Sequence, residues 1–439
     1  MSAATSGRRQ IAGRAVGTAF DQGLSSLSNA AAVFLVAGAL SAGDFGWFAV
    51  GMTVALLTSN LTRPLTGVLL LLVGADLAGT DGRVAGRRAA GAALGWGAAV
   101  GAAVVLAGLL LPVSGTGRAV LLVAGFGLPV LVLQDTLRYV CFRDGRPWRA
   151  VLNDATWLLV IATALPVMRS AGIESPTAYL LVWVGGAAAG AVVAVLREGW
   201  LPDTRHGMSW SWHSRRVARD VLVEQAAAQG AAQGSVLLVG AVVGVGATGG
   251  LRGAQTLLGP LAVLQMAACA FVIPEVVRRP WLTRRQRIGT ALAVALPLAV
   301  ANLAYGLALT ALPTGAGELL LGDAWAGTSE MVFPMSAWAA ATALYIGPLC
   351  VLQAVGRADV AARISVVLAP LLLAGALVGS HLGGAPGAAW GLTAAATSVL
   401  FLWWPALVAH SGRQLVAADA GAPVVPRGPR HAAGRRGGA

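Results

Sequence analysis

Apolar runs of membrane-spanning length recur along the whole chain, and short polar segments separate them. Each run is close to the ~20 residues that cross a bilayer as an α-helix. The pattern therefore predicts an all-α integral membrane protein with about twelve transmembrane helices. The expected spans are residues 15–40, 47–73, 89–111, 119–141, 150–167, 178–196, 221–243, 251–277, 288–312, 331–355, 360–378 and 388–409.

Arginine alternates between the segments that join these runs. All but four of the 31 basic residues lie in, or within one helical turn of, the N-terminal segment, every second loop or the C-terminal segment. Because cytoplasmic loops carry an excess of positive charge, this distribution predicts a multi-pass protein of the cytoplasmic membrane with both termini in the cytoplasm. The expected parts are a cytoplasmic N-terminus (1–14), a six-helix lobe (15–196), a cytoplasmic or interfacial linker (197–220), a second six-helix lobe (221–410) and a disordered basic cytoplasmic tail (411–439).

Composition supports the same class of protein. Hydrophobic residues make up 57% of the chain and charged residues 11%, whereas a soluble domain of this length needs a more charged surface. The net charge of +13 is spread over short segments, which argues against nucleic acid and favours contact with anionic lipid headgroups. Cys141, Cys269 and Cys350 fall in or at the ends of apolar runs, which is typical of buried small side chains and not of disulfides or metal ligands.

The first span is polar in its first half. Asp21, Ser25, Ser28 and Asn29 fall on one helical face, with Gln22 beside it. A carboxylate and an amide are costly in hydrocarbon, so this face is expected to look into a protein interior or a wet cavity. The first helix therefore indicates a polytopic protein with a polar interior.

The two halves of the chain are similar in pattern. Aligning the acid–Gln pair of the first span with Glu224 and Gln225 also aligns residues 41–46 with residues 244–249. Gln229 follows Gln225 by four positions and shares its helical face. The similarity reflects either a duplication or a chance alignment of Ala- and Gly-rich spans. A duplication implies two bundles in parallel orientation, with both acid–Gln pairs facing a cavity between them.

Several polar residues of the spans share the predicted inner half of the membrane. Such a set forms structural ion pairs, for example Asp21 with Arg63, or lines a vestibule in which guanidinium groups meet phosphate. For Asp135 and Arg138 we favour a structural or interfacial role, because Arg138 can extend to the cytoplasmic surface. The set consists of Asp21, Arg63, Gln134, Asp135, Arg138 and Glu224.

Arg252 and Gln255 lie near the outer end of the eighth span, where they are candidates for outer-cavity contacts or interfacial anchors. The five histidines lie in loops or the tail without metal-ligand or triad-like spacing, so no catalytic residue, metal site or cofactor is expected. The candidate substrate-binding residues are Asp21, Gln22, Asn29, Arg63, Gln134, Asp135, Glu224, Gln225, Gln229, Arg252 and Gln255.

Three segments of the chain carry a family resemblance. They are FDQGLSSLSNAAAVFLVAGALSAGDFGWFAV (20–50), RDGRPWRAVLNDATW (143–157) and LRGAQTLLGPLAVL (251–264). They resemble the first helix and turn, the fourth loop with the fifth span, and the eighth span of polysaccharide-biosynthesis membrane proteins. Those proteins are flippase-like members of the multidrug/oligosaccharidyl-lipid/polysaccharide exporter superfamily.

The resemblance covers essentially residues 17–410. It implies two six-helix lobes around a central cavity, alternating access, and movement of a lipid-linked oligosaccharide or polysaccharide precursor across the membrane. Family members proposed to move lipid-linked sugars carry cavity arginines for the pyrophosphate, and Arg63 is the best match. The partners expected are membrane lipids, the lipid-linked glycan, a coupling cation (H⁺ or Na⁺) and glycan-assembly enzymes.

Two alternatives to a transporter of lipid-linked sugars remain. The first is a small-molecule or drug-efflux transporter, MATE-like or of the major facilitator type. Residues 79–88, GTDGRVAGRR, come close to the major facilitator loop signature but have an extra residue on each side of Val84. The second is a membrane glycosyltransferase or polymerase, which needs catalytic groups in sizeable outer loops. The outer loops here are short, so we expect that the chain is not an enzyme.

Overall fold

The computed structural model describes residues 21, 23–74, 79–279 and 281–411. The predicted N-terminal segment, Gln22 and the tail beyond Ser411 lie outside the described residues. The described chain is helical apart from short turns and contains no strand. Nine of its helical stretches are long and apolar enough to cross a membrane.

Three features bring these nine stretches to the twelve spans expected from the sequence. The stretch Ala358–His410 turns back at Gly383 and Gly384, where Gly384 has a φ of 60° that glycine adopts without strain. This stretch therefore makes two passes. The shorter apolar helix Gly23–Ala37 supplies the first span, and the helices over 245–278 supply the eighth.

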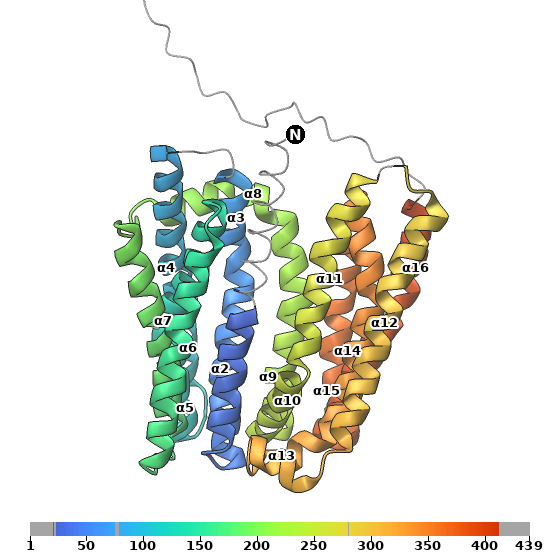
Figure 1. The fold of residues 1–439 in the computed structure, drawn as a ribbon. Helices are drawn as coiled ribbons and strands as arrows, with labels where there is room; N and C mark the ends of the chain where they lie inside the picture. Colours follow the sequence, from blue (N-terminus) through green and yellow to red (C-terminus); the bar gives the residue numbers. More distant parts are fainter. Residues whose placement is uncertain (1–20, 22, 75–78, 280, 412–439) are drawn as a thin grey trace, which may run out of the picture.

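Two bundles of helices lie side by side (Figure 1). The first bundle begins with the helix Gly23–Ala37. It continues with α2 (Ala42–Thr62), the 3₁₀ helix η1 (Arg63–Leu65), α3 (Gly67–Gly74), α4 (Gly79–Leu110), α5 (Gly115–Arg143), α6 (Pro147–Ser170) and α7 (Pro176–Glu198). Within it α4 packs along α5 and α6 packs along α7.

The linker helix α8 leads into the second bundle, across the top of the view in Figure 1. The elements that follow the first bundle are α8 (Gly207–Gln225), the π-helical turn η2 (Ala226–Gly230), α9 (Ala231–Val243), α10 (Val245–Leu257), α11 (Gly259–Arg278), α12 (Arg284–Thr310), α13 (Thr314–Leu321), α14 (Ala324–Ala354), α15 (Ala358–Ser398) and α16 (Leu400–His410). Helices α10, α11, α12 and α15 all pack against α14. The all-α fold with two lobes is thus confirmed.

Two polar segments that the sequence placed in loops are helical. α4 begins at Gly79, so the basic residues 79–88 form its first turns. α8 covers much of the linker, and hydrogen bonds hold it on the first bundle. Trp96 Nε1 donates to Ser211 Oγ (3.0 Å), which donates to the carbonyl of Leu65 (2.7 Å).

The two bundles meet closely where α2 and α10 begin. A Cβ atom on Gly46 would collide with the carbonyl oxygen of Val245, and one on Gly249 would lie 3.2 Å from the Cα of Gly46. Gly46 and Gly249 are equivalent in the predicted repeat, as is expected where related helices cross near a pseudo-two-fold axis. The arginine distribution makes this the predicted outer end; the opposite end, where α3 and α8 lie, is the predicted inner end.

Candidate functional site

Five charged side chains form one ion-pair network inside the first bundle. The guanidinium of Arg63 grips Asp135 with two hydrogen bonds, Nε to Oδ2 at 2.9 Å and Nη2 to Oδ1 at 3.0 Å. Arg138 contacts three carboxylates. Its Nη2 lies 2.6 Å from Asp21 Oδ2, its Nη1 3.5 Å from Asp135 Oδ1 and its Nε 3.4 Å from Asp154 Oδ2.

The local sequence places Arg63 at a break between two helices. Pro64 has no N–H to donate to the carbonyl of Asn60, so α2 ends and the chain tightens into the 3₁₀ helix Arg63–Leu65. The hydroxyl of Thr66 then donates to the carbonyl of Thr62 (3.1 Å) and satisfies part of the broken ladder. The break turns the arginine towards α5, which carries its carboxylate partner.

Neighbouring amides complete the network. Gln134 Nε2 donates to Asp154 Oδ1 at 2.6 Å, and Arg63 Nη1 donates to Asn60 Oδ1 at 3.2 Å. These bonds hold the carboxylate of Asp154 and the guanidinium of Arg63 in fixed orientations. Charged groups in a membrane interior persist only with such partners, because an unpaired charge there is costly.

The members of the network differ in how exposed their side chains are. The side chains of Asp21 and Arg138 are 0% and 7% exposed, whereas that of Arg63 is 29% exposed. Arg63 is therefore the cationic group of the network that a bound molecule can reach. Among the described residues of the network, three carboxylates face two guanidinium groups, which leaves one negative charge in excess.

The structure corrects two expectations about these residues. Asp21 pairs with Arg138 and not with Arg63, whose partner is Asp135. Arg138 does not extend to the cytoplasmic surface, because it is buried at the centre of the network. Sequence reasoning also missed Asp154; a carboxylate in the second turn of a predicted span was the signal that could have found it.

The predicted shared cavity is wrong for Asp21, because its carboxylate is enclosed within the first bundle. The aligned acid on the seventh span, Glu224, is half-buried and accepts a hydrogen bond from Gln225 at 3.3 Å. The π-helical turn Ala226–Gly230 follows at once and carries the exposed Gln229. Single π-turns inside α-helices occur frequently at functional sites.

Asn29 of the first helix is half-buried, and its Oδ1 has no hydrogen-bond partner among the described residues. Gln22 lies outside the described residues. The structure thus brings Asp21, Arg63, Gln134 and Asp135 into one network. It places the other described candidates elsewhere.

Arg252 stands apart from every carboxylate of the described chain. It lies on α10 and is 9% exposed, its Nη1 donates to Gln255 Oε1 at 3.3 Å, and its Nε has no partner in the described residues. Thr248, Arg252 and Gln255 share one face of α10. That face is turned to α9, because a Cβ on Gly240 of α9 would collide with the Thr248 hydroxyl.

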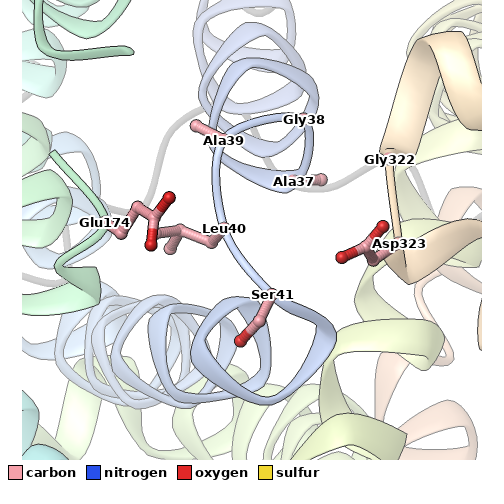
Figure 2. A pocket seen from close by; sticks show the side chains of 8 residues that line it. All are labelled: Ala37, Gly38, Ala39, Leu40, Ser41, Glu174, Gly322 and Asp323. Carbon is pink, nitrogen blue, oxygen red and sulfur yellow. The ribbon is translucent and has the colours of Figure 1, made fainter. Parts of the chain in front are cut away.

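A cavity of about 300 Å³ opens at the predicted outer end (Figure 2). It is lined by residues 37–41, Glu174, Gly322 and Asp323, and so by loops of both bundles. Figure 2 shows the carboxylates of Glu174 and Asp323 on opposite sides of the chain that joins the first helix to α2. None of the candidate substrate-binding residues lines this cavity.

Solved structures of membrane transporters have a similar architecture. The chain superimposes on an inward-facing multidrug resistance MATE family transporter of the MOP superfamily with a TM-score of 0.65 at 14% identity, covering 88% of this chain and 95% of that one. The lipid II flippase MurJ in an inward closed conformation gives 0.61 at 11% identity, covering 90% and 87%. This chain therefore has the fold of the multidrug/oligosaccharidyl-lipid/polysaccharide (MOP) exporter superfamily.

The likeness confirms the fold expected from the sequence resemblance, and these structures are transporters and a flippase rather than enzymes. An outward-facing MATE family transporter gives a lower TM-score of 0.55 at 14% identity, covering 92% and 96%. No family model and no curated protein matches the sequence.

Proposed function

We propose that this chain moves a lipid-linked oligosaccharide or polysaccharide precursor across the cytoplasmic membrane by alternating access, with both termini in the cytoplasm. Its lobes meet at the predicted outer end through α2 and α10, and η2 also contacts the last turn of α2 near the predicted inner end. Opening of the inner contact admits the substrate. Separation of α2 from α10 then opens the other side.

The observation that carries the substrate class is the isolated charge of Arg252. The arginine side chain stays protonated in proteins, so a buried guanidinium without a carboxylate partner is an uncompensated positive charge. Arg138, the other buried arginine of the predicted spans in the described chain, has carboxylate partners, whereas Arg287 lies at the predicted inner end, just before the ninth span, and donates to the carbonyl of Ser411. Arg252 has only a neutral amide. A phosphate or pyrophosphate group supplies the missing negative charge, whereas a cationic drug is repelled.

Arg63 provides a second cationic contact at a different depth. Gly46 and Gly249 touch and so lie at one level. At 1.5 Å per residue, Arg252 lies ~5 Å along α10 from Gly249, and Arg63 lies ~25 Å along α2 from Gly46. The two guanidinium groups are therefore separated by roughly 20 Å along the membrane normal. An anionic headgroup that leaves Arg63 at the inner level is received by Arg252 near the outer level.

The one negative charge in excess in the ion-pair network of the first lobe can bind the expected coupling cation. Three carboxylates share two guanidinium groups, so a proton or Na⁺ bound there neutralises the network. Asp21 and Asp154 are the most enclosed of the three carboxylates. Their burial makes an uncompensated charge costly and so favours uptake of the cation.

The test uses the full-length chain in proteoliposomes with a fluorescent polyprenyl-pyrophosphate oligosaccharide in the outer leaflet. A membrane-impermeant reductant reports how much label has moved inwards. Loss of one hydrogen bond to a charged group costs ~1.5–3 kcal/mol, so Arg252→Gln is expected to slow movement at least about tenfold. Arg118→Gln, an exposed arginine at the same end, is the matched control.

Two outcomes contradict the proposal. The first is an unchanged rate in Arg252→Gln. The second is a wild-type protein that leaves the pyrophosphate lipid in place but accumulates a cationic dye, which selects the small-molecule transporter instead. Arg252→Gln is not expected to lower stability, because it removes an unpaired buried charge. A slow but stable variant therefore points to lost function and not to lost folding.

A further inference from the structure

Two of the three cysteines lie in contact. The Sγ atoms of Cys269 on α11 and Cys350 on α14 are 2.7 Å apart, although 81 positions separate the residues in sequence. Both are free thiols, and the third, Cys141, is buried in the other lobe. We propose that Cys269 and Cys350 are a peroxide-reactive pair that forms a reversible disulfide between α11 and α14. The proposal is independent of the transported substrate.

The two thiols differ in access. Cys350 is 0% exposed, whereas Cys269 is half-buried. Met266, one turn before Cys269 on α11, is exposed on the surface of the spanning region. An oxidant dissolved in the membrane or at its surface therefore reaches Cys269 first. Cys350 is buried and acts as the second thiol, which reacts with the oxidised Cys269.

The pair lies near the predicted inner end of the lobe and not at mid-membrane. α14 ends at Ala354, one turn beyond Cys350. A Cβ on Gly347 of α14 would collide with the carbonyl of Ala291 on α12, so these two helices are in register there. Arg287, one turn from Ala291, therefore lies at the level of Cys350, so the thiol pair lies at the depth of the arginine-rich inner loops.

The chemistry balances with one hydroperoxide. The Cys269 thiolate attacks the O–O bond, which releases an alcohol and leaves a sulfenic acid on Cys269. Cys350 then attacks that sulfur, the S–S bond forms, and water leaves. In total, two thiols and one ROOH give a disulfide, ROH and H₂O. A disulfide has sulfur atoms about 2 Å apart, so the thiols approach by less than about 1 Å.

The bond would join helices that already share a partner. α10 packs on α14, where a Cβ on Gly253 would press on Thr328 at 2.6 Å. α11 continues the same span after a break at Leu258 and also packs on α14. A disulfide at Cys269 therefore fixes both halves of the eighth span on one helix.

The test treats the full-length chain in lipid nanodiscs with cumene hydroperoxide or with hydrogen peroxide. Free thiols are then alkylated in denaturant, and the digest is analysed by mass spectrometry. The expected product is a Cys269–Cys350 linked peptide that a phosphine reductant reverses, while Cys141 is recovered as the alkylated thiol. Faster linkage with cumene hydroperoxide assigns the oxidant to the lipid phase; faster linkage with hydrogen peroxide assigns it to water.

Two variants separate the roles of the thiols. Cys350→Ser leaves Cys269 as a sulfenic acid that dimedone traps, and Cys269→Ser gives neither product. The wild-type measurement alone overturns the proposal if both cysteines are recovered as thiols after both peroxides. A disulfide that contains Cys141 overturns it as well.

Discussion

Arg138 holds the ion-pair network of the first lobe together, and its removal gives the sharpest test of the structure. Its guanidinium lies within 3.5 Å of Asp21, Asp135 and Asp154, and its side chain is 7% exposed. In Arg138→Gln, Asp135 keeps Arg63, but Asp21 and Asp154 lose their cation. Breaking a buried ion pair by removing one partner costs ~3–5 kcal/mol.

Removing the carboxylate of Asp21, and not the guanidinium of Arg138, is expected to lower the free energy of unfolding by a smaller amount. Asp21→Asn leaves Arg138 with two carboxylates, and the asparagine carbonyl still accepts one hydrogen bond. The loss is then that of one charge-assisted hydrogen bond, about 1.5–3 kcal/mol. Combining Asp21→Asn with Arg138→Gln removes one stranded carboxylate, so the double variant is expected to be more stable than Arg138→Gln alone.

The assay is reversible unfolding of the purified full-length chain by SDS titration in mixed micelles, followed by tryptophan fluorescence. Arg118→Gln is the matched control, because Arg118 is an exposed arginine of the same helix, and its change is expected within about 0.5 kcal/mol. The reasoning is refuted if Arg138→Gln costs no more than Asp21→Asn, or if the double variant gains nothing over Arg138→Gln.

Three further outcomes are expected. Arg63→Lys keeps the charge but loses the planar two-bond grip on Asp135, so transport is expected to fall about tenfold or more at normal membrane abundance; full transport contradicts a role in substrate binding. Gly46→Val separates α2 from α10, and a cysteine placed at Thr248 then reacts faster with an impermeant maleimide added outside. Gly43→Val is its control, because nothing lies within 4 Å of a Cβ there, and equal reactivity of the two variants argues against the closed contact. Cysteine labelling is expected to place residues 79–88 inside and residues 41–46 outside; the reverse result inverts the proposed topology.

Hydropathy and charge along the chain determined much of the fold. Apolar runs of ~20 residues must satisfy their backbone hydrogen bonds internally within a membrane, so each of them is a helix. The same reasoning separated the spans 360–378 and 388–409, and the chain turns back between them at Gly383 and Gly384. The prediction that Arg63 needs an anionic partner also followed from depth alone.

The identity of that partner was decided only by the tertiary structure. Helical periodicity fixes which residues of one helix share a face, but it does not say which helix lies opposite. Asp21 and Arg138 are 117 positions apart, and Arg63 and Asp135 are 72 apart. The sequence suggested Arg63 as the partner of Asp21, whereas the packing of α5 against the other helices of the first bundle selected Arg138.

The same limit applies to the contacts of the second lobe. The sequence places Cys269, Cys350 and Arg252 in apolar helices, and nothing in their spacing distinguishes a pair from isolated residues. Contact between the two thiols depends on the relative rotation of α11 and α14. Whether Arg252 has a carboxylate partner depends on which side chains surround α10, and among the described residues it has the amide of Gln255. Local sequence sets each helix and its depth, whereas long-range packing decides which charges are compensated and which are not.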